Sequence, residues 1–104
     1  MNWRRVASLA ELPPGSVRRV VVEGIAIALC NVGGELYAVD DQCTHAFASL
    51  SEGTLSGDSL ECPLHGGRFD VRSGAALGGV VSEDLRRFAV RREGDAVYVA
   101  LGDA

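Results

Sequence analysis

The chain has 104 residues and a formal net charge of −4. All 10 basic residues are arginine and no basic run exceeds two residues, which argues against a nucleic-acid-binding protein. The length suits a single domain with its own core and leaves too few residues for a second domain with a core of its own.

The cysteine count and the apolar segments bear on where the protein works. Three cysteines are an odd number, so we expect a reducing compartment and no disulfide framework, with Cys30 as a small buried hydrophobe. The N-terminus, MNWRRVASLAELPPG, lacks the apolar core of a signal peptide. The longest apolar stretch, residues 20–30, is interrupted by Glu23-Gly24 and is too short to span a bilayer. These features predict a soluble, cytoplasmic protein that does not bind membranes.

Short runs rich in β-branched and aromatic residues follow one another along the chain at hairpin spacing. They predict strands over residues 3–7, 17–22, 25–31, 35–39, 59–61, 68–71, 85–92 and 96–101. The first is expected at a sheet edge, and residues 8–11 are expected to form a short turn stopped by Pro13-Pro14. Gly78-Gly79 is expected to open a flexible loop.

The run 25–31 has two different faces. Ile25, Ile27 and Leu29 alternate with two alanines and Cys30, so one face is apolar and the other is small, which predicts an inner strand. Because the chain shows almost no helical periodicity, the whole pattern predicts an all-β fold, an antiparallel β-sandwich or small barrel.

Residues 43–70 hold both histidines and two of the three cysteines. They occur as Cys43-Thr44-His45 and, after sixteen intervening residues, Cys62-Pro63-Leu64-His65. Each short segment offers one thiolate and one imidazole, which predicts a metal site. Tetrahedral zinc accepts such a mixture. So does a two-iron, two-sulfide cluster in which two histidines replace two cysteines on one iron, with each segment giving one ligand to each iron.

The pattern C-x-H, sixteen residues and C-x-x-H, continued as CPLHGGRFD, resembles the Rieske iron–sulfur signature. From Trp3 to Leu101 the chain is similar to the small Rieske-type ferredoxins of bacterial aromatic-ring-hydroxylating dioxygenase systems. The resemblance implies a single Rieske domain over residues 1–104. In it, a small cluster-binding lobe of about 43–70 is inserted in a β base of about 1–42 and 71–104.

The resemblance also implies one Rieske-type [2Fe–2S] cluster. Cys43 and Cys62 would hold one iron as thiolates, and His45 and His65 would hold the other through neutral imidazole. All four ligand positions are then supplied by the protein, so the chain is expected to move electrons and not to be an enzyme.

Three functions follow from this site. The first, implied by the resemblance, is a soluble carrier of single electrons from a flavin-dependent NAD(P)H reductase to a terminal aromatic-ring-hydroxylating oxygenase, with transient contacts near His45 and His65. The second is an electron-transfer small subunit of a larger reductase of the nitrite reductase type. The third, from another class, is a zinc-stabilised binding module without redox activity.

Several positions differ from the Rieske proteins of respiratory and photosynthetic cytochrome complexes. The cysteines that form a disulfide between the ligand loops there match Ala48 and Leu64, and the serine and tyrosine that donate to cluster sulfurs match Gly67 and Phe69. The resemblance therefore implies a reduction potential toward the low end of the roughly −150 to +300 mV range of such clusters.

Other residues near the motif have simpler interpretations. Many relatives carry a proline in a third loop, which residues 75–80 lack, so a looser cover over the cluster is expected. Phe47, Leu50 and Leu64 are expected to pack in the lobe or to shield the cluster from water. Asp40-Asp41 is expected to be a solvated charge pair, or else a docking feature for a basic partner.

Overall fold

The computed structural model describes residues 2–44, 47–64, 66–78, 81 and 83–101. The described residues form ten β-strands and two short 3-10 helices. The strands are β1 (Trp3–Ser8), β2 (Val17–Val22), β3 (Ile25–Val32), β4 (Glu35–Asp40), β5 (Thr54–Ser56), β6 (Ser59–Glu61), β7 (Arg68–Asp70), β8 (Ala76–Gly78), β9 (Arg87–Glu93) and β10 (Ala96–Ala100). The helices are η1 (Leu9–Glu11) and η2 (Leu50–Glu52). No helix among these residues is long and apolar enough to cross a membrane.

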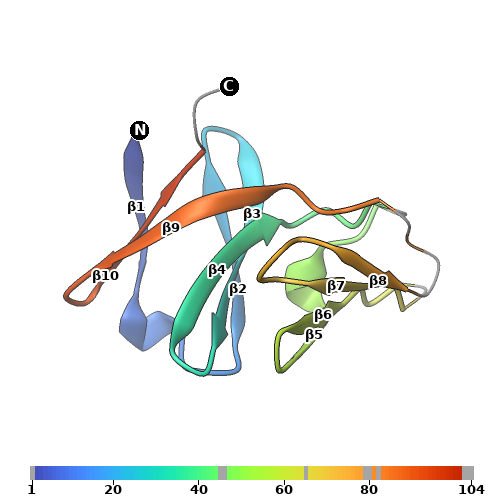
Figure 1. The fold of residues 1–104 in the computed structure, drawn as a ribbon. Coiled ribbons are helices and arrows are strands. Elements are labelled where there is room, and N and C mark those ends of the chain that lie inside the picture. The colour runs from blue at the N-terminus through green and yellow to red at the C-terminus, as the bar shows by residue number, and fades with distance from the viewer. Residues whose placement is uncertain (1, 45–46, 65, 79–80, 82, 102–104) are drawn as a thin grey trace.

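Six strands form an antiparallel sheet in the order β1-β10-β9-β4-β3-β2, which curls so that its two end strands also contact each other (Figure 1). An ion pair of 3.7 Å between Arg4 on β1 and Glu23 in the β2–β3 turn bridges these ends. The sheet is therefore a nearly closed barrel, and β1 is an edge strand, as predicted.

Tight turns of the expected kind join these strands. Glu23 and Gly24 have φ of 50° and 82°, and Gly33 and Gly34 have φ of 59° and 102°. Two successive residues with positive φ make the turn whose twist matches a β-hairpin, and glycine adopts this conformation without steric cost. The predicted hairpins between β2 and β3 and between β3 and β4 are confirmed.

The other four strands form a second antiparallel sheet, in the order β5-β6-β7-β8, beside the barrel (Figure 1). Gly53 lets this sheet pack closely, because a Cβ at this position would lie 1.9 Å from the carbonyl oxygen of Glu61. Any side chain at residue 53 would therefore push η2 and β5 away from β6.

The inner strand β3 lines two apolar cores. Ile27 and Leu29 pack inside the barrel, whereas Ala28 and Cys30 pack against the second sheet and the segment before η2. The small side chains on this face of β3 leave room for larger residues of the second sheet, such as Phe69. The contrast between apolar and small faces seen in the sequence thus separates the two cores, and the prediction of an inner strand is confirmed.

Some element predictions were wrong. Strands β5 and β8 were not predicted. Gly78 is the last residue of β8, and the rest of the loop predicted to open at Gly78-Gly79 lies partly outside the described residues. The predicted strand 85–92 begins at Arg87, because Leu85 instead donates its backbone N–H to the carbonyl of Gly74 at 2.7 Å. The second sheet also continues past residue 70, where we placed the end of the lobe.

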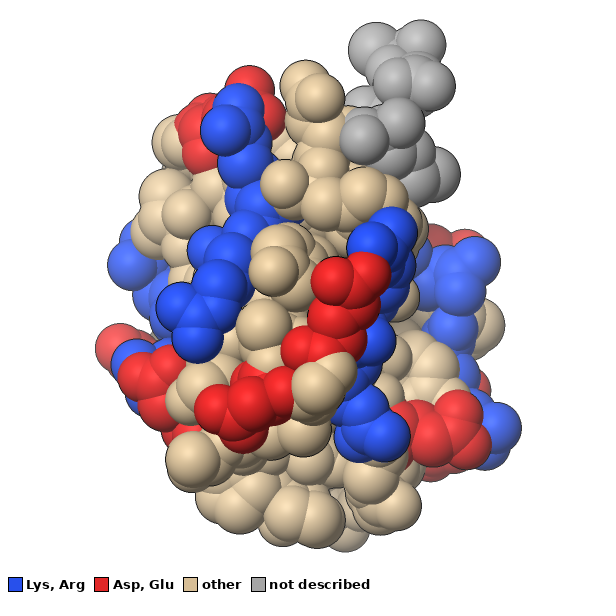
Figure 2. Space-filling view, turned by 90° about the vertical axis from the view of Figure 1, so that its left-hand side faces the viewer, with Lys and Arg blue, Asp and Glu red and all other residues tan. Residues whose placement is uncertain are grey.

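Arginine and acidic side chains lie in adjacent rows on the face of the barrel opposite the second sheet (Figure 2). Ion pairs in the barrel include Arg18 with Glu11 at 3.3 Å, and Arg91 with Glu93. This face therefore presents charges of both signs instead of one basic patch.

Candidate metal centre

Cys43 and Cys62 lie in the core between the two sheets. Cys62 directly follows β6, and Cys43 follows β4 after Asp41 and Gln42. Their exposed fractions are 3% and 1%, and they belong to the same cluster of buried residues. The structure thus brings together two of the four predicted ligands from positions 19 residues apart. The other two, His45 and His65, lie outside the described residues.

Each of the two ligand loops, residues 43–48 and 62–67, is closed by a backbone hydrogen bond of the same type. The backbone N–H of Cys43 donates to the carbonyl of Ala48 at 3.1 Å, and that of Cys62 donates to the carbonyl of Gly67 at 2.7 Å. Just outside the first loop, Gln42 pairs with Ser49, and outside the second Glu61 pairs with Arg68. Each cysteine therefore begins a hairpin loop, and in the sequence each loop contains one histidine.

The thiols of Cys43 and Cys62 are neighbours, and their burial suits metal binding better than ionisation without a metal. Burial raises the pKa of the Cys62 thiol, and the adjacent Cys43 thiol raises it further, while the backbone N–H of Leu64 lowers it. A buried thiolate pair needs a positive partner, and iron or zinc supplies one. Both cysteines are free of disulfides. The donors present thus fit a metal centre that takes two thiolates from this side.

Val81 and Glu83 brace the two ligand loops. The Thr44 hydroxyl donates to the carbonyl of Glu83 at 3.1 Å, which ties down the first loop. On the second loop, a Cβ added at Gly67 would lie 2.5 Å from Cγ1 of Val81, itself only 8% exposed. No local pattern in the sequence indicates this partner of Thr44, which lies 39 residues away. The looser cover expected over 75–80 falls partly outside the described residues.

Asp41 anchors the start of the first ligand loop to three other segments. Its backbone N–H donates to the carbonyl of Ala26 at 3.1 Å, and its carbonyl accepts the N–H of Leu50 at 2.6 Å. Its carboxylate accepts the N–H of Ser51 at 2.8 Å and lies 3.3 Å from Nε of Arg19. With 1% exposure, Asp41 is not the solvated charge predicted for it. Its partners are distant in sequence, so no local pattern identified its burial.

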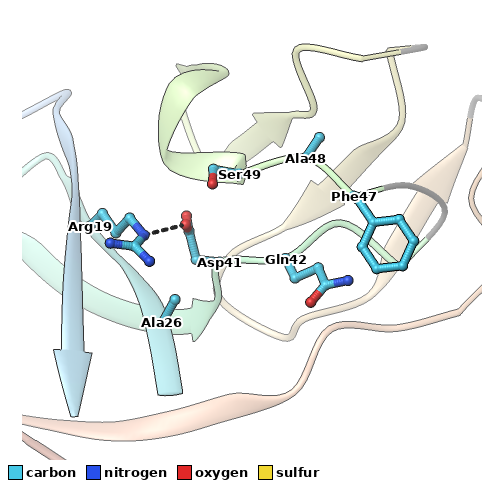
Figure 3. Close-up of a pocket in the computed structure, with 7 residues that line it drawn as sticks. All are labelled: Arg19, Ala26, Asp41, Gln42, Phe47, Ala48 and Ser49. Atoms are coloured by element: carbon cyan, nitrogen blue, oxygen red, sulfur yellow. Dashed lines mark ion pairs between the residues drawn. The ribbon is translucent and has the colours of Figure 1, made fainter. Parts of the chain in front are cut away.

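A hollow of about 250 Å³ lies beside the first ligand loop. Figure 3 shows Arg19 and Asp41 facing each other at one end and Phe47 at the other. Phe47 is 96% exposed, so it does not pack in the lobe, which was one of the two expectations for it. Leu50, which was grouped with it, is fully buried in the core. Leu64 on the second loop is 44% exposed.

Comparison with known proteins identifies the family. Residues 2–100 match the model of the Rieske [2Fe-2S] domain. The chain is 46% identical over 100 residues to the ferredoxin component of a naphthalene 1,2-dioxygenase system of Pseudomonas aeruginosa, covering 96% of each chain. It is 44% identical over 99 residues to ferredoxin CarAc of Metapseudomonas resinovorans, covering 94% of this chain and 92% of that protein.

Solved structures share the fold. A chain in the complex of reduced oxygenase and oxidised ferredoxin in carbazole 1,9a-dioxygenase matches with a TM-score of 0.91 and 42% identity, covering 98% of this chain and 95% of that one. The ferredoxin of carbazole 1,9a-dioxygenase from Nocardioides aromaticivorans IC177 matches with a TM-score of 0.91 and 35% identity, covering 96% and 98%. The predicted all-β, Rieske-like fold is confirmed. The cofactor of this domain is one [2Fe–2S] cluster, which decides between the iron and zinc alternatives. The chain belongs to the Rieske [2Fe–2S] family.

Proposed function

We propose that this protein is the ferredoxin component of an aromatic-ring-hydroxylating dioxygenase system, carrying single electrons from a flavin-dependent NAD(P)H reductase to a terminal oxygenase. One observation carries the proposal: relatives named as ferredoxin components of such systems match almost end to end, with 96% of each chain aligned in the case at 46% identity. The relatives are electron-transfer components, and the protein itself is not an enzyme.

Cys43, Cys62, His45 and His65 are the residues that would hold the cluster. The burial of Cys43 and Cys62 in one core and the identical closure of their two loops support this assignment. When bound, the cluster takes up and releases one electron. The chain keeps water from the sulfur side through the packing of residues such as Leu60 and Phe69, both fully buried in the same core.

The ligand loops would also form the docking surface. Phe47 and Leu64 are large apolar side chains that the loops leave exposed, at 96% and 44%. Exposed aromatic and apolar groups of this kind are typical anchors of protein–protein contacts. We place the transient contacts with reductase and oxygenase here, near His45 and His65.

The proposed organisation is one Rieske domain over residues 1–104 that works in the cytoplasm. The lobe that carries the ligands would comprise residues 43–70 together with β8, since β8 hydrogen-bonds to β7. The base would comprise about 1–42 and the chain after β8, because β9 and β10 complete the barrel.

The test uses protein purified with its native metal. We expect about two irons and two acid-labile sulfides per chain and the red-brown absorption of a mixed-ligand cluster. In stopped-flow experiments, NADH or NADPH with a flavin reductase should bleach this absorption, and a ring-hydroxylating oxygenase should restore it. Zinc without labile sulfide would refute the cluster and with it the carrier role, because the same four side chains can also bind zinc. A cluster that relays no electrons to any such oxygenase would refute the carrier role alone.

A further inference from the structure

Asp41 holds a carboxylate inside the protein beside the first ligand loop. The side chain of Asp41 is 2% exposed, whereas that of its ion-pair partner Arg19 is 54% exposed. Water therefore screens the guanidinium far more than the carboxylate. The two partners are therefore screened unequally, and the buried partner carries the negative charge.

The backbone of Asp41 lies close to that of the proposed ligand Cys43. Asp41 and Cys43 are two residues apart, so their Cα atoms are within about 7 Å of each other. Charges at such range act strongly through a protein interior, where the effective dielectric constant is about 20 and not about 80.

The charge of Asp41 affects a thiol in the core between the two sheets. The pKa of the Cys30 thiol is raised to about 12, first by burial and then by the charge of Asp41. Cys30 packs in the same apolar core as Cys43 and Cys62. The negative charge that disfavours a thiolate at Cys30 would also disfavour an added electron on a cluster held by Cys43 and Cys62.

We propose that Asp41 and Arg19 tune the reduction potential of the site with opposite signs, the carboxylate lowering it and the guanidinium raising it. The inference rests on the proposed ligand set, and it does not depend on which partners the protein serves. Neither Asp41 nor Arg19 is a proposed ligand, so both act on the site electrostatically, through space.

Three variants test the proposal in the metal-loaded protein: Asp41→Asn, Arg19→Gln and the double variant. Asparagine keeps a carbonyl oxygen that can accept the Ser51 N–H, so D41N removes the charge while retaining this bond. In spectroelectrochemical titrations with redox mediators, D41N should raise the ratio of reduced to oxidised protein at a fixed potential on the order of tenfold. R19Q should lower this ratio, by less because of screening, and the double variant should return toward the wild type.

Arg18→Gln is the matched control. Arg18 is the neighbour of Arg19 on β2 and pairs with Glu11 at 3.3 Å, on the exposed surface. R18Q should leave the potential unchanged, although it alters the net charge as R19Q does.

The outcomes separate the proposal from its premises. A wild type without cluster absorption would refute the cluster and with it the tuning proposal. If variants load normally and D41N and R19Q shift the potential in the same direction, or not at all, the tuning proposal is wrong. If D41N fails to load, the comparison of R19Q with R18Q decides, because the Arg19 side chain is 54% exposed and shortening it leaves no cavity in the core.

Discussion

At the scale of single residues, Gly67 decides how closely the second ligand loop approaches Val81. Gly67→Ala would place a methyl group 2.5 Å from Cγ1 of Val81, so the two segments must separate. We expect a loss of about 1–3 kcal/mol in the free energy of unfolding, as for other overpacked cores. Thermal unfolding of the metal-loaded protein measures it.

Val81→Ala supplies the control for this clash. The double variant G67A/V81A should be more stable than G67A alone, because the shortened side chain makes room for the new methyl group. If V81A and G67A destabilise additively, the clash with Val81 is not the cause of the loss.

Residue-level predictions succeeded where the signal was local. The spacing of Cys43 and Cys62 indicated their common site, and the apolar run around Cys30 indicated its burial, now seen as 0% exposure. Asp41 and Phe47 were misjudged because their environments depend on segments far away in sequence. The structure brings the two cysteines together, but the ligand roles of Cys43, His45, Cys62 and His65 stay predictions.

At the scale of elements, the two ligand loops are held by residues after β8, namely Val81 and Glu83. Thr44→Val keeps the shape of the side chain but removes the hydrogen bond to the carbonyl of Glu83. We expect a cost of about 1 kcal/mol and faster loss of the cluster, because the first loop is then freer to open. The decay of visible absorption in the presence of an iron chelator at constant temperature measures the rate.

Ser16→Ala is a suitable control for T44V. Ser16 makes a comparable bond, from its hydroxyl to the carbonyl of Pro13 at 2.6 Å, in the barrel and away from the lobe. This variant should lose similar stability while its cluster decays at the wild-type rate. Equal acceleration in both variants would mean that general loosening, and not the brace, controls cluster loss.

Hairpins of the barrel were predictable because their turns are encoded locally, as at Glu23-Gly24. Strands β5 and β8 were not, since three-residue strands such as Ala76–Gly78 have little intrinsic β-propensity and form through pairing with their neighbours. The closure of both ligand loops by the same backbone hydrogen bond was also not predictable from composition.

At the scale of the whole molecule, the proposed docking surface can be separated from the redox site. Phe47→Ser removes the most exposed aromatic side chain of the ligand loops without disturbing a packed core. We expect the concentration of ferredoxin needed for half-maximal oxygenase turnover to rise on the order of tenfold, as for loss of an interface anchor. The reduction potential should stay unchanged, because Phe47 carries no charge.

Leu77→Ser is the comparison for this variant. Leu77 is 48% exposed on β8, outside both ligand loops, so its loss should leave turnover unaffected. A normal half-saturation concentration for F47S would remove Phe47 from the contact surface and leave the carrier role standing.

The two-faced strand β3 has a consequence for how the molecule comes apart. Leu29 packs in the barrel core, and Ala28 packs in the core that also holds the ligand cysteines. Because both residues belong to β3, neither core can unfold without disrupting the other. Heating the wild-type protein should therefore bleach its colour at the same temperature at which the β-sheet circular dichroism collapses. Loss of the visible absorption would then report cooperative unfolding of the whole domain.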